Sequence, residues 1–106
     1  MRTFMKVSCE VKASNKALKD GSLQKAVEQA MKLTNPECAY FLTLDGLRTM
    51  VMVFDMKDPS QIPSIAEPFF LLLNAKVEFH PAMNAEDLQK GIVAAFAMEE
   101  TMANTN

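Results

Sequence analysis

The dipeptide Asp45-Gly46 lies between two runs of apolar, β-branched and aromatic residues, and it constrains the fold more than any other feature of the chain. Such a dipeptide between strand-forming segments predicts a β-hairpin with a two-residue turn. The pairs that this turn sets are Leu44 with Leu47, Leu42 with Thr49 and Tyr40 with Val51. Because both faces of the second strand are mostly apolar, we expect that strand to lie in the middle of a sheet, covered on both sides.

The periodicity of the apolar residues predicts two more strands and three helices. Alternation with a period of two predicts strands at Met5–Val11 and Ala75–Pro81. Apolar residues at helical spacing predict helices that begin at Ser22, at Asp58-Pro59 and at Asn84. We expect residues 15–20 to be a lead-in segment without helix. Pro63 and Pro68 each remove a backbone hydrogen bond, so we expect a short first turn in the second helix and then a kink or break near Glu67.

This order of elements predicts an α+β protein. Its first six elements follow the ferredoxin-like βαββαβ arrangement, and an extra C-terminal helix comes after them. The expected sheet is antiparallel and four-stranded, with the first and third strands in the centre and two helices on one face. A chain of 106 residues with 49% hydrophobic residues suits one domain, which we place at residues 1–100. Residues 101–106 are expected to fray.

The sheet face away from the helices is predicted to be partly apolar. From the outer segments it would carry Lys6, Ser8, Glu10, Lys76, Glu78 and His80. From the hairpin it would carry Phe41, Thr43, Met50, Met52 and Phe54. Proteins seldom leave an apolar patch of this size in water. We therefore predict a homodimer whose sheets face each other as a dimeric α+β barrel, with a cavity between them.

Charge and composition exclude several classes of function. The net charge is −2 and no Lys/Arg cluster occurs, so neither nucleic acid nor an anionic membrane is an expected partner. Two cysteines and one histidine, at no usual ligand spacing, predict neither a metal site nor a disulfide framework. No glycine-rich phosphate loop occurs, and no cofactor is expected. The N-terminal residues alternate instead of forming the apolar run of a signal peptide, so a cytoplasmic location is expected.

His80, the only histidine, is the candidate general base, because its ordinary pKa lies near neutrality. We expect Glu10 to lie beside it and to orient its imidazole. The expected ligand-binding residues around them are Tyr40, Phe54, Met52 and Ser8. The alternatives stay open: His80 as a polar strand-end or dimer-contact residue, and Tyr40 as a core residue with its hydroxyl at the rim. Arg48, next to the turn, is interpreted as a solvated or dimer-contact charge.

Two segments carry a resemblance to known proteins. DPSQIPSIAEP at Asp58–Pro68 and VEFHPAM at Val77–Met83 resemble recurring features of a family of small bacterial proteins in the dimeric α+β barrel superfamily. The likeness covers nearly the whole chain and implies a ferredoxin-like dimer, but it brings no established activity. More distantly, the second predicted helix and the V-x-F-x-P pattern after it are similar to muconolactone isomerase and to small cofactor-free monooxygenases. Their catalytic residues have no recognisable counterparts here.

Two functions follow as hypotheses. In the first, a homodimer binds a small, partly apolar molecule in a cavity against the sheet and turns it over by proton transfer without a cofactor. In the second, the protein is a dimerisation module without a ligand, and the uncovered sheet face is only an interface. The two hypotheses differ in whether a cavity remains once the dimer has formed.

Overall fold

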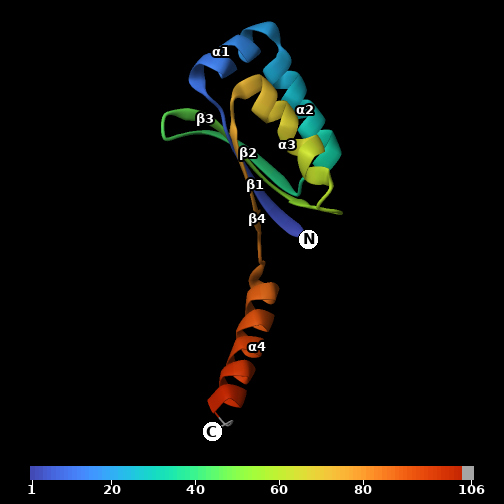
Figure 1. The fold of residues 1–106 in the computed structure, drawn as a ribbon, viewed down its shortest axis with the longest axis vertical. Helices are drawn as coiled ribbons and strands as arrows, with labels where there is room; N and C mark the ends of the chain where they lie inside the picture. The colour runs from blue at the N-terminus through green and yellow to red at the C-terminus, as the bar shows by residue number, and fades with distance from the viewer. Residues whose placement is uncertain (104–106) are drawn as a thin grey trace.

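A four-stranded antiparallel sheet organises the protein, and its strand order is β2-β3-β1-β4. The structure is a computed structural model that describes residues 1–103. Its elements are β1 (Arg2–Ser8), α1 (Val11–Asp20), α2 (Ser22–Thr34), β2 (Cys38–Leu44), β3 (Leu47–Asp55), α3 (Gln61–Leu73), β4 (Lys76–Pro81) and α4 (Ala85–Ala103). Helices α1, α2 and α3 lie on one side of the sheet (Figure 1). The predicted α+β class, and the central position of the first and third strands, are therefore confirmed.

The hairpin has the predicted register. Leu44 pairs with Leu47, Leu42 with Thr49 and Tyr40 with Val51. Asp45 and Gly46 both have positive φ, at 54° and 74°, as a two-residue turn of this twist requires. Glycine adopts such angles without cost and aspartate tolerates them, so these two residues determine the pairing of both strands.

The two faces of the hairpin are the reverse of our prediction. β1 pairs with β3 so that Met5 lies opposite Met52 and Val7 lies opposite Met50. Opposite residues of an antiparallel pair share a face, so Met50, Met52 and Phe54 join the buried side of β1 beneath the helices. The predicted placement of these residues, with Phe41 and Thr43, on the uncovered face was wrong. Both faces of the hairpin carry apolar side chains, so the alternation within the hairpin did not identify which face is buried beneath the helices.

The uncovered face of the sheet is still partly apolar, but other residues make it so. We call it the open face. In addition to side chains of β1 and β4, it carries the hairpin residues that alternate with Phe41, Met50 and Met52. Its apolar members are Phe4, Tyr40, Leu42, Leu44, Val51 and Val53. Lys6, Ser8, Lys76, Glu78 and His80 lie on this face as predicted. No helix of the same chain covers it (Figure 1).

Helix α1 occupies residues that include the predicted lead-in segment, so that prediction was wrong. Ser14 and Ala17 are the buried residues of α1. The helix ends at Gly21, whose φ of 84° is the left-handed conformation common after a helix. Only these two residues of α1 face the core, and its remaining residues are mainly polar, which explains the weak apolar periodicity of this segment.

The sequence predicts a kink or break near Glu67, and the structure shows no break, because helix α3 continues through Pro68. Ile65, Ala66, Phe69 and Leu73 on its inner side are all buried, with at most 2% of their surface exposed. Burial of these side chains on the sheet stabilises the helix, and this outweighs the hydrogen bond that Pro68 cannot form. Tertiary packing thus overrides the local effect of proline.

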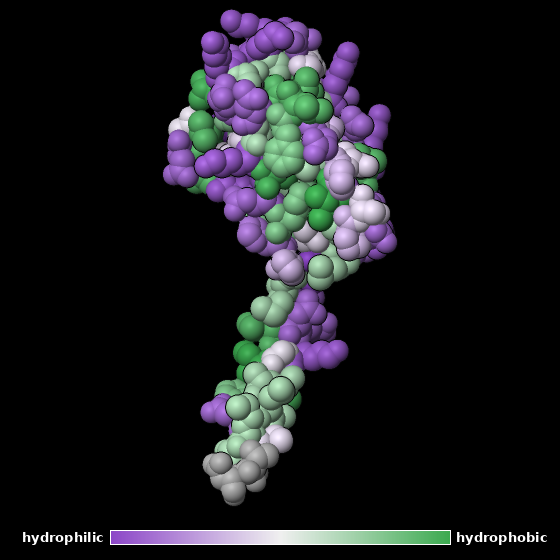
Figure 2. Space-filling model, in the orientation of Figure 1, coloured by the Kyte–Doolittle hydropathy of each residue, from purple (hydrophilic) through white to green (hydrophobic). Residues whose placement is uncertain are grey.

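Helix α4 projects away from the rest of the protein. It continues the direction of β4 beyond the sheet, and the molecule measures 65 × 27 × 21 Å as a result (Figure 1). None of its residues is buried. Its large apolar side chains are all exposed: Leu88, Ile92, Val93, Phe96, Met98 and Met102. Figure 2 shows apolar atoms along one side of this projecting helix.

The start of α4 is well defined by local hydrogen bonds. The Asn84 side chain accepts from the backbone N–H of Asp87 at 2.8 Å, and the Asp87 carboxylate accepts from that of Asn84 at 3.0 Å. This reciprocal cap agrees with the predicted helix start at Asn84. The helix runs to Ala103, three residues into the segment expected to fray, and residues 104–106 of that segment lie outside the described residues. Within residues 1–103, no helix has the length and apolarity needed to cross a membrane.

Candidate functional site

His80 lies on the open face near the end of the edge strand β4. Its Nε2 atom is 3.4 Å from a carboxylate oxygen of Glu78, and its ring centroid is 6.3 Å from that of Phe4. The side chain is 57% exposed, so neither neighbour encloses it. Within residues 1–103, His80 is therefore a largely exposed side chain on an edge strand.

Glu10 does not lie beside His80. The β1–β4 register pairs His80 with Phe4, six residues before Glu10, which corresponds to about 20 Å along an extended strand. Glu10 is the residue that precedes α1, and its carboxylate accepts a hydrogen bond from the Asn74 side chain at 3.3 Å. The strand was predicted to reach Val11, whereas β1 ends at Ser8. The predicted contact of Glu10 with His80 was therefore wrong.

The four predicted ligand-binding residues lie on opposite faces of the sheet. Ser8 and Tyr40 are on the open face, where Tyr40 is 66% exposed. Met52 and Phe54 are on the helix side and are almost completely buried. These four residues therefore do not line one pocket within a single chain. The division follows from the hairpin register described above.

An apolar cavity of about 350 Å³ lies instead on the helix side of the sheet, near the hairpin turn. We call it the hairpin cleft. Its sheet and hairpin residues are Val7, Cys9, Phe41, Leu42, Thr43, Arg48, Thr49 and Met50. The helices contribute Leu23 and Val27 from α2 and Phe69 and Leu73 from α3. Phe41 points to the helix side yet is 61% exposed, because no helix fully covers this end of the hairpin.

Among the described residues, 1–103, Arg48 is the only charged one that lines the hairpin cleft. Its Nη1 atom donates to the Ser14 hydroxyl at 2.6 Å and to the Asn15 side-chain oxygen at 2.8 Å, and the Val11 carbonyl is 3.5 Å away. All three acceptors are uncharged and belong to α1. Within residues 1–103, no carboxylate forms an ion pair with this guanidinium, and Nε and Nη2 have no hydrogen-bond acceptor.

Cys9 contributes a thiol to the same cleft. It is 5% exposed, and its backbone N–H donates to the Arg48 carbonyl at 2.9 Å. Burial raises the pKa of the Cys9 thiol, and the positive charge of Arg48 offsets only part of that rise. The thiol is therefore protonated at neutral pH, which does not favour a role as a nucleophile.

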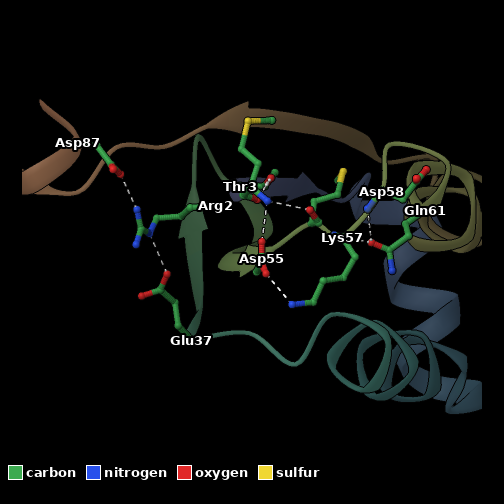
Figure 3. A network of polar contacts seen from close by, with 10 residues as sticks. Arg2, Thr3, Glu37, Asp55, Lys57, Asp58, Gln61 and Asp87 are labelled. Carbon is green, nitrogen blue, oxygen red and sulfur yellow. Dashed lines mark hydrogen bonds and ion pairs between the residues drawn. The ribbon is translucent and has the colours of Figure 1, made fainter. Parts of the chain in front are cut away.

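A second arginine provides a contrast at the other end of the sheet (Figure 3). Arg2 forms ion pairs with Glu37 at 3.2 Å and with Asp87 at 2.8 Å. Nearby, Asp55 binds the N-terminal amino group and Lys57, each at 2.6 Å. The charges of this network neutralise one another, so it ties the N-terminus, β3 and the start of α4 together. We assign it a structural role.

Sequence reasoning did not identify the hairpin cleft or the place of Arg48. One signal was present, because Arg48 alternates with Met50, Met52 and Phe54 and so shares their face of the strand. An arginine on a buried strand face needs polar partners. Identifying that face required the pairing of β3 with β1. Residues 1–103 contain no group of three His, Cys, Asp or Glu side chains that could bind a metal ion.

Comparison with known proteins gives no family for this chain. No protein-family model matches the sequence, and no curated protein matches it. The candidate site is therefore defined by its geometry alone: an apolar cleft with one arginine that has no acidic partner among residues 1–103.

Proposed function

We propose that this protein binds a small, largely apolar molecule in the hairpin cleft. The observation that carries the proposal is the cavity of about 350 Å³ with an almost entirely apolar lining. Small-molecule sites in proteins are concave, mostly apolar and about 300–1,000 Å³ in volume, with few polar groups that orient the ligand. A ligand that covers the exposed ring of Phe41 would remove apolar surface from water, which is the main source of binding free energy in such sites.

The fold suits this role. We propose that the domain is ferredoxin-like and belongs to the dimeric α+β barrel superfamily. Support comes from the strand order β2-β3-β1-β4, with helices on one face, and from the resemblance of the segments Asp58–Pro68 and Val77–Met83. Fold alone does not identify a ligand, so the proposal rests on the hairpin cleft.

We further propose that the protein is a homodimer in which a second copy covers the open face and α4. Both surfaces are partly apolar, and residues 1–103 of one chain cover neither of them. The 19 residues of α4 span about 28 Å, close to the ~23–30 Å of strands with seven to nine residues, so one helix can lie along a partner's sheet. Glu99 and Glu100 on α4 also complement Lys76 on the open face, whereas Lys6 already pairs with Glu78 at 3.8 Å.

Ligand binding can be tested with a substitution that fills the cleft. Val27 lines the cleft from α2, and Val27→Trp would occupy part of its volume. We expect this variant to weaken binding of N-phenyl-1-naphthylamine, an uncharged fluorescent probe, by tenfold or more. Gln29→Trp, which adds the same side chain at an exposed position of α2, serves as the control. Equal probe affinity in the two variants would refute the cleft as the binding site.

A second candidate function is self-association without a ligand, and the open face together with α4 favours it. In that case the protein is a dimer, and the naphthylamine probe binds neither the wild type nor the Gln29→Trp control. Proton transfer by His80 stays a prediction. It would take place on the open face, at the interface of the proposed dimer, and not in the hairpin cleft.

A further inference from the structure

We infer that the ligand of the hairpin cleft carries a carboxylate, or a comparable anionic group, which Arg48 binds. The inference rests on the proposed function and specifies the chemical class of the ligand. The expected ligand is a monoacid with an apolar body, such as a medium-chain or aryl carboxylic acid.

The two arginines of this protein differ in how their charge is compensated. Arg2 has two carboxylate partners, Glu37 and Asp87. Arg48 is half-buried, and its acceptors are a hydroxyl, an amide oxygen and a backbone carbonyl. A guanidinium removed from water gains more from an anion than from neutral acceptors, because bonds between charged partners are about twice as strong. Arg48 therefore has an electrostatic requirement that residues 1–103 do not meet.

The hydrogen bonds that Arg48 forms with α1 also determine which of its N–H groups remain for a ligand. Nη1 is held by Ser14 and Asn15 on α1, which fixes the guanidinium at the edge of the cleft. Nε and Nη2 remain as N–H donors. These two donors lie side by side in a rigid plane and match the two oxygens of a carboxylate. A side chain already fixed by α1 loses little conformational freedom when a ligand binds.

The surroundings of Arg48 determine the rest of the ligand. Val27, Met50 and Phe69 are among the apolar residues that line the cleft, and no acidic side chain of residues 1–103 does so. Charges attract more strongly beside an apolar wall than in bulk water. A cationic ligand would be repelled by Arg48, and a neutral one would leave its charge partly desolvated and unpaired. An apolar body with one anionic end satisfies both parts of the site.

The test compares octanoate with 1-octanol, which have the same chain length and differ in charge at one end. We expect isothermal titration calorimetry to show at least tenfold tighter binding of octanoate to the wild type. In Arg48→Gln, octanoate should lose about tenfold or more of its affinity, while 1-octanol binds as before. Lys32→Gln, which removes a positive charge from an exposed position outside the cleft, should leave both affinities unchanged.

The possible outcomes separate the inference from the proposed function. Equal affinity of the wild type for both compounds would overturn the inference and leave the apolar cleft as a binding site. Failure of both compounds to bind the wild type would overturn the proposed function, and the inference with it. Arg48 also holds α1 through Ser14 and Asn15, so Arg48→Gln can impair folding. If it does, the wild-type comparison still decides, and Arg48→Lys, which keeps the charge without the planar fork, should show an intermediate loss.

Discussion

Single ionic groups of this protein have separate roles, and Asp55 illustrates the structural one. Its carboxylate binds Lys57 and the N-terminal amino group at the end of β3 (Figure 3). Hydrogen bonding to Lys57, followed by that to the amino group, lowers the pKa of Asp55 from 3.8 to about 2. The folded state therefore favours the ionised carboxylate more than the unfolded chain does.

This shift predicts how Asp55 contributes to stability as pH changes. Because the folded-state pKa is the lower one, the contribution is complete above the unfolded value of 3.8 and is lost as pH falls through about 2. We expect Asp55→Asn to lower the urea midpoint at pH 6. The difference from the wild type should shrink as pH falls below 3.8 and should be lost below about pH 2. Asp45→Asn, which removes a carboxylate from the exposed turn, is the control and should not reproduce this pattern. A difference that stays constant from pH 6 to pH 2 would contradict the assignment.

At the scale of elements, helix α3 contains two prolines in different positions. Pro63 lies in the first turn, where backbone N–H groups have no partner within the helix. Pro68 lies in the interior, where its missing N–H leaves the Ser64 carbonyl without the usual helix bond. The helix persists because its inner side is buried on the sheet. The two prolines therefore differ in their effect on the free energy of unfolding although they lie on the same helix.

Replacing each proline by alanine measures this difference. We expect Pro68→Ala to raise the free energy of unfolding by about 1–3 kcal/mol, because alanine restores a helix hydrogen bond and a favourable helix propensity. Pro63→Ala should change it by less than about 1 kcal/mol, since only the entropy of the unfolded chain is affected. Urea denaturation monitored by circular dichroism gives both values. Equal effects of the two substitutions would show that Pro68 is not strained in the helix.

The hairpin and α1 show what local sequence can and cannot predict. Asp45-Gly46 fixes the turn, and the turn fixes the register of β2 and β3, so local residues were sufficient. The choice of inner face was not local, because both faces of the hairpin are apolar and pairing with β1 decides it. Helix α1 depends on Ser14, which is fully buried and is bound by Arg48 from β3.

The candidate site was less predictable than the fold for the same reason. The hairpin cleft is lined by β1, α2, the hairpin and α3, which are far apart in the sequence. Arg48 becomes a site residue only where α1 fixes its guanidinium beside the apolar lining. His80 was a candidate because of its side-chain type alone, which says nothing about where the residue lies in the fold. Glu10 was expected to be its partner because the alternation predicted a first strand that reaches Val11. In the structure, β1 ends at Ser8.

At the scale of the whole molecule, α4 is the feature that a single chain does not explain. It is capped at Asn84 and tied to Arg2 through Asp87, so its start is fixed to the domain. Beyond this point its apolar residues, including Ile92 and Phe96, lie in solvent. Exposed apolar surface of this extent marks an interaction site. In the proposed dimer, this helix is part of the interface.

A pair of substitutions on α4 tests the dimer. We expect the wild type to have twice the chain mass of 11.8 kDa in light scattering at micromolar concentration. Phe96→Glu places a charge on the apolar side of α4 and should shift the protein toward the monomer. Ala94→Glu adds the same charge on the other side of the helix and should remain dimeric, because residues two apart do not share a helix face. A monomeric wild type would refute the proposed assembly.

NMR of methyl-labelled methionines can locate a small molecule bound in the hairpin cleft. Met50 lines the cleft, whereas Met83 lies after β4 and Met98 lies on α4, so these methyl groups report on separate regions. On addition of octanoate, we predict a saturable shift of the Met50 methyl signal, with Met83 and Met98 unchanged. Saturable shifts of Met98 without any change at Met50 would place the ligand outside the cleft and contradict the account.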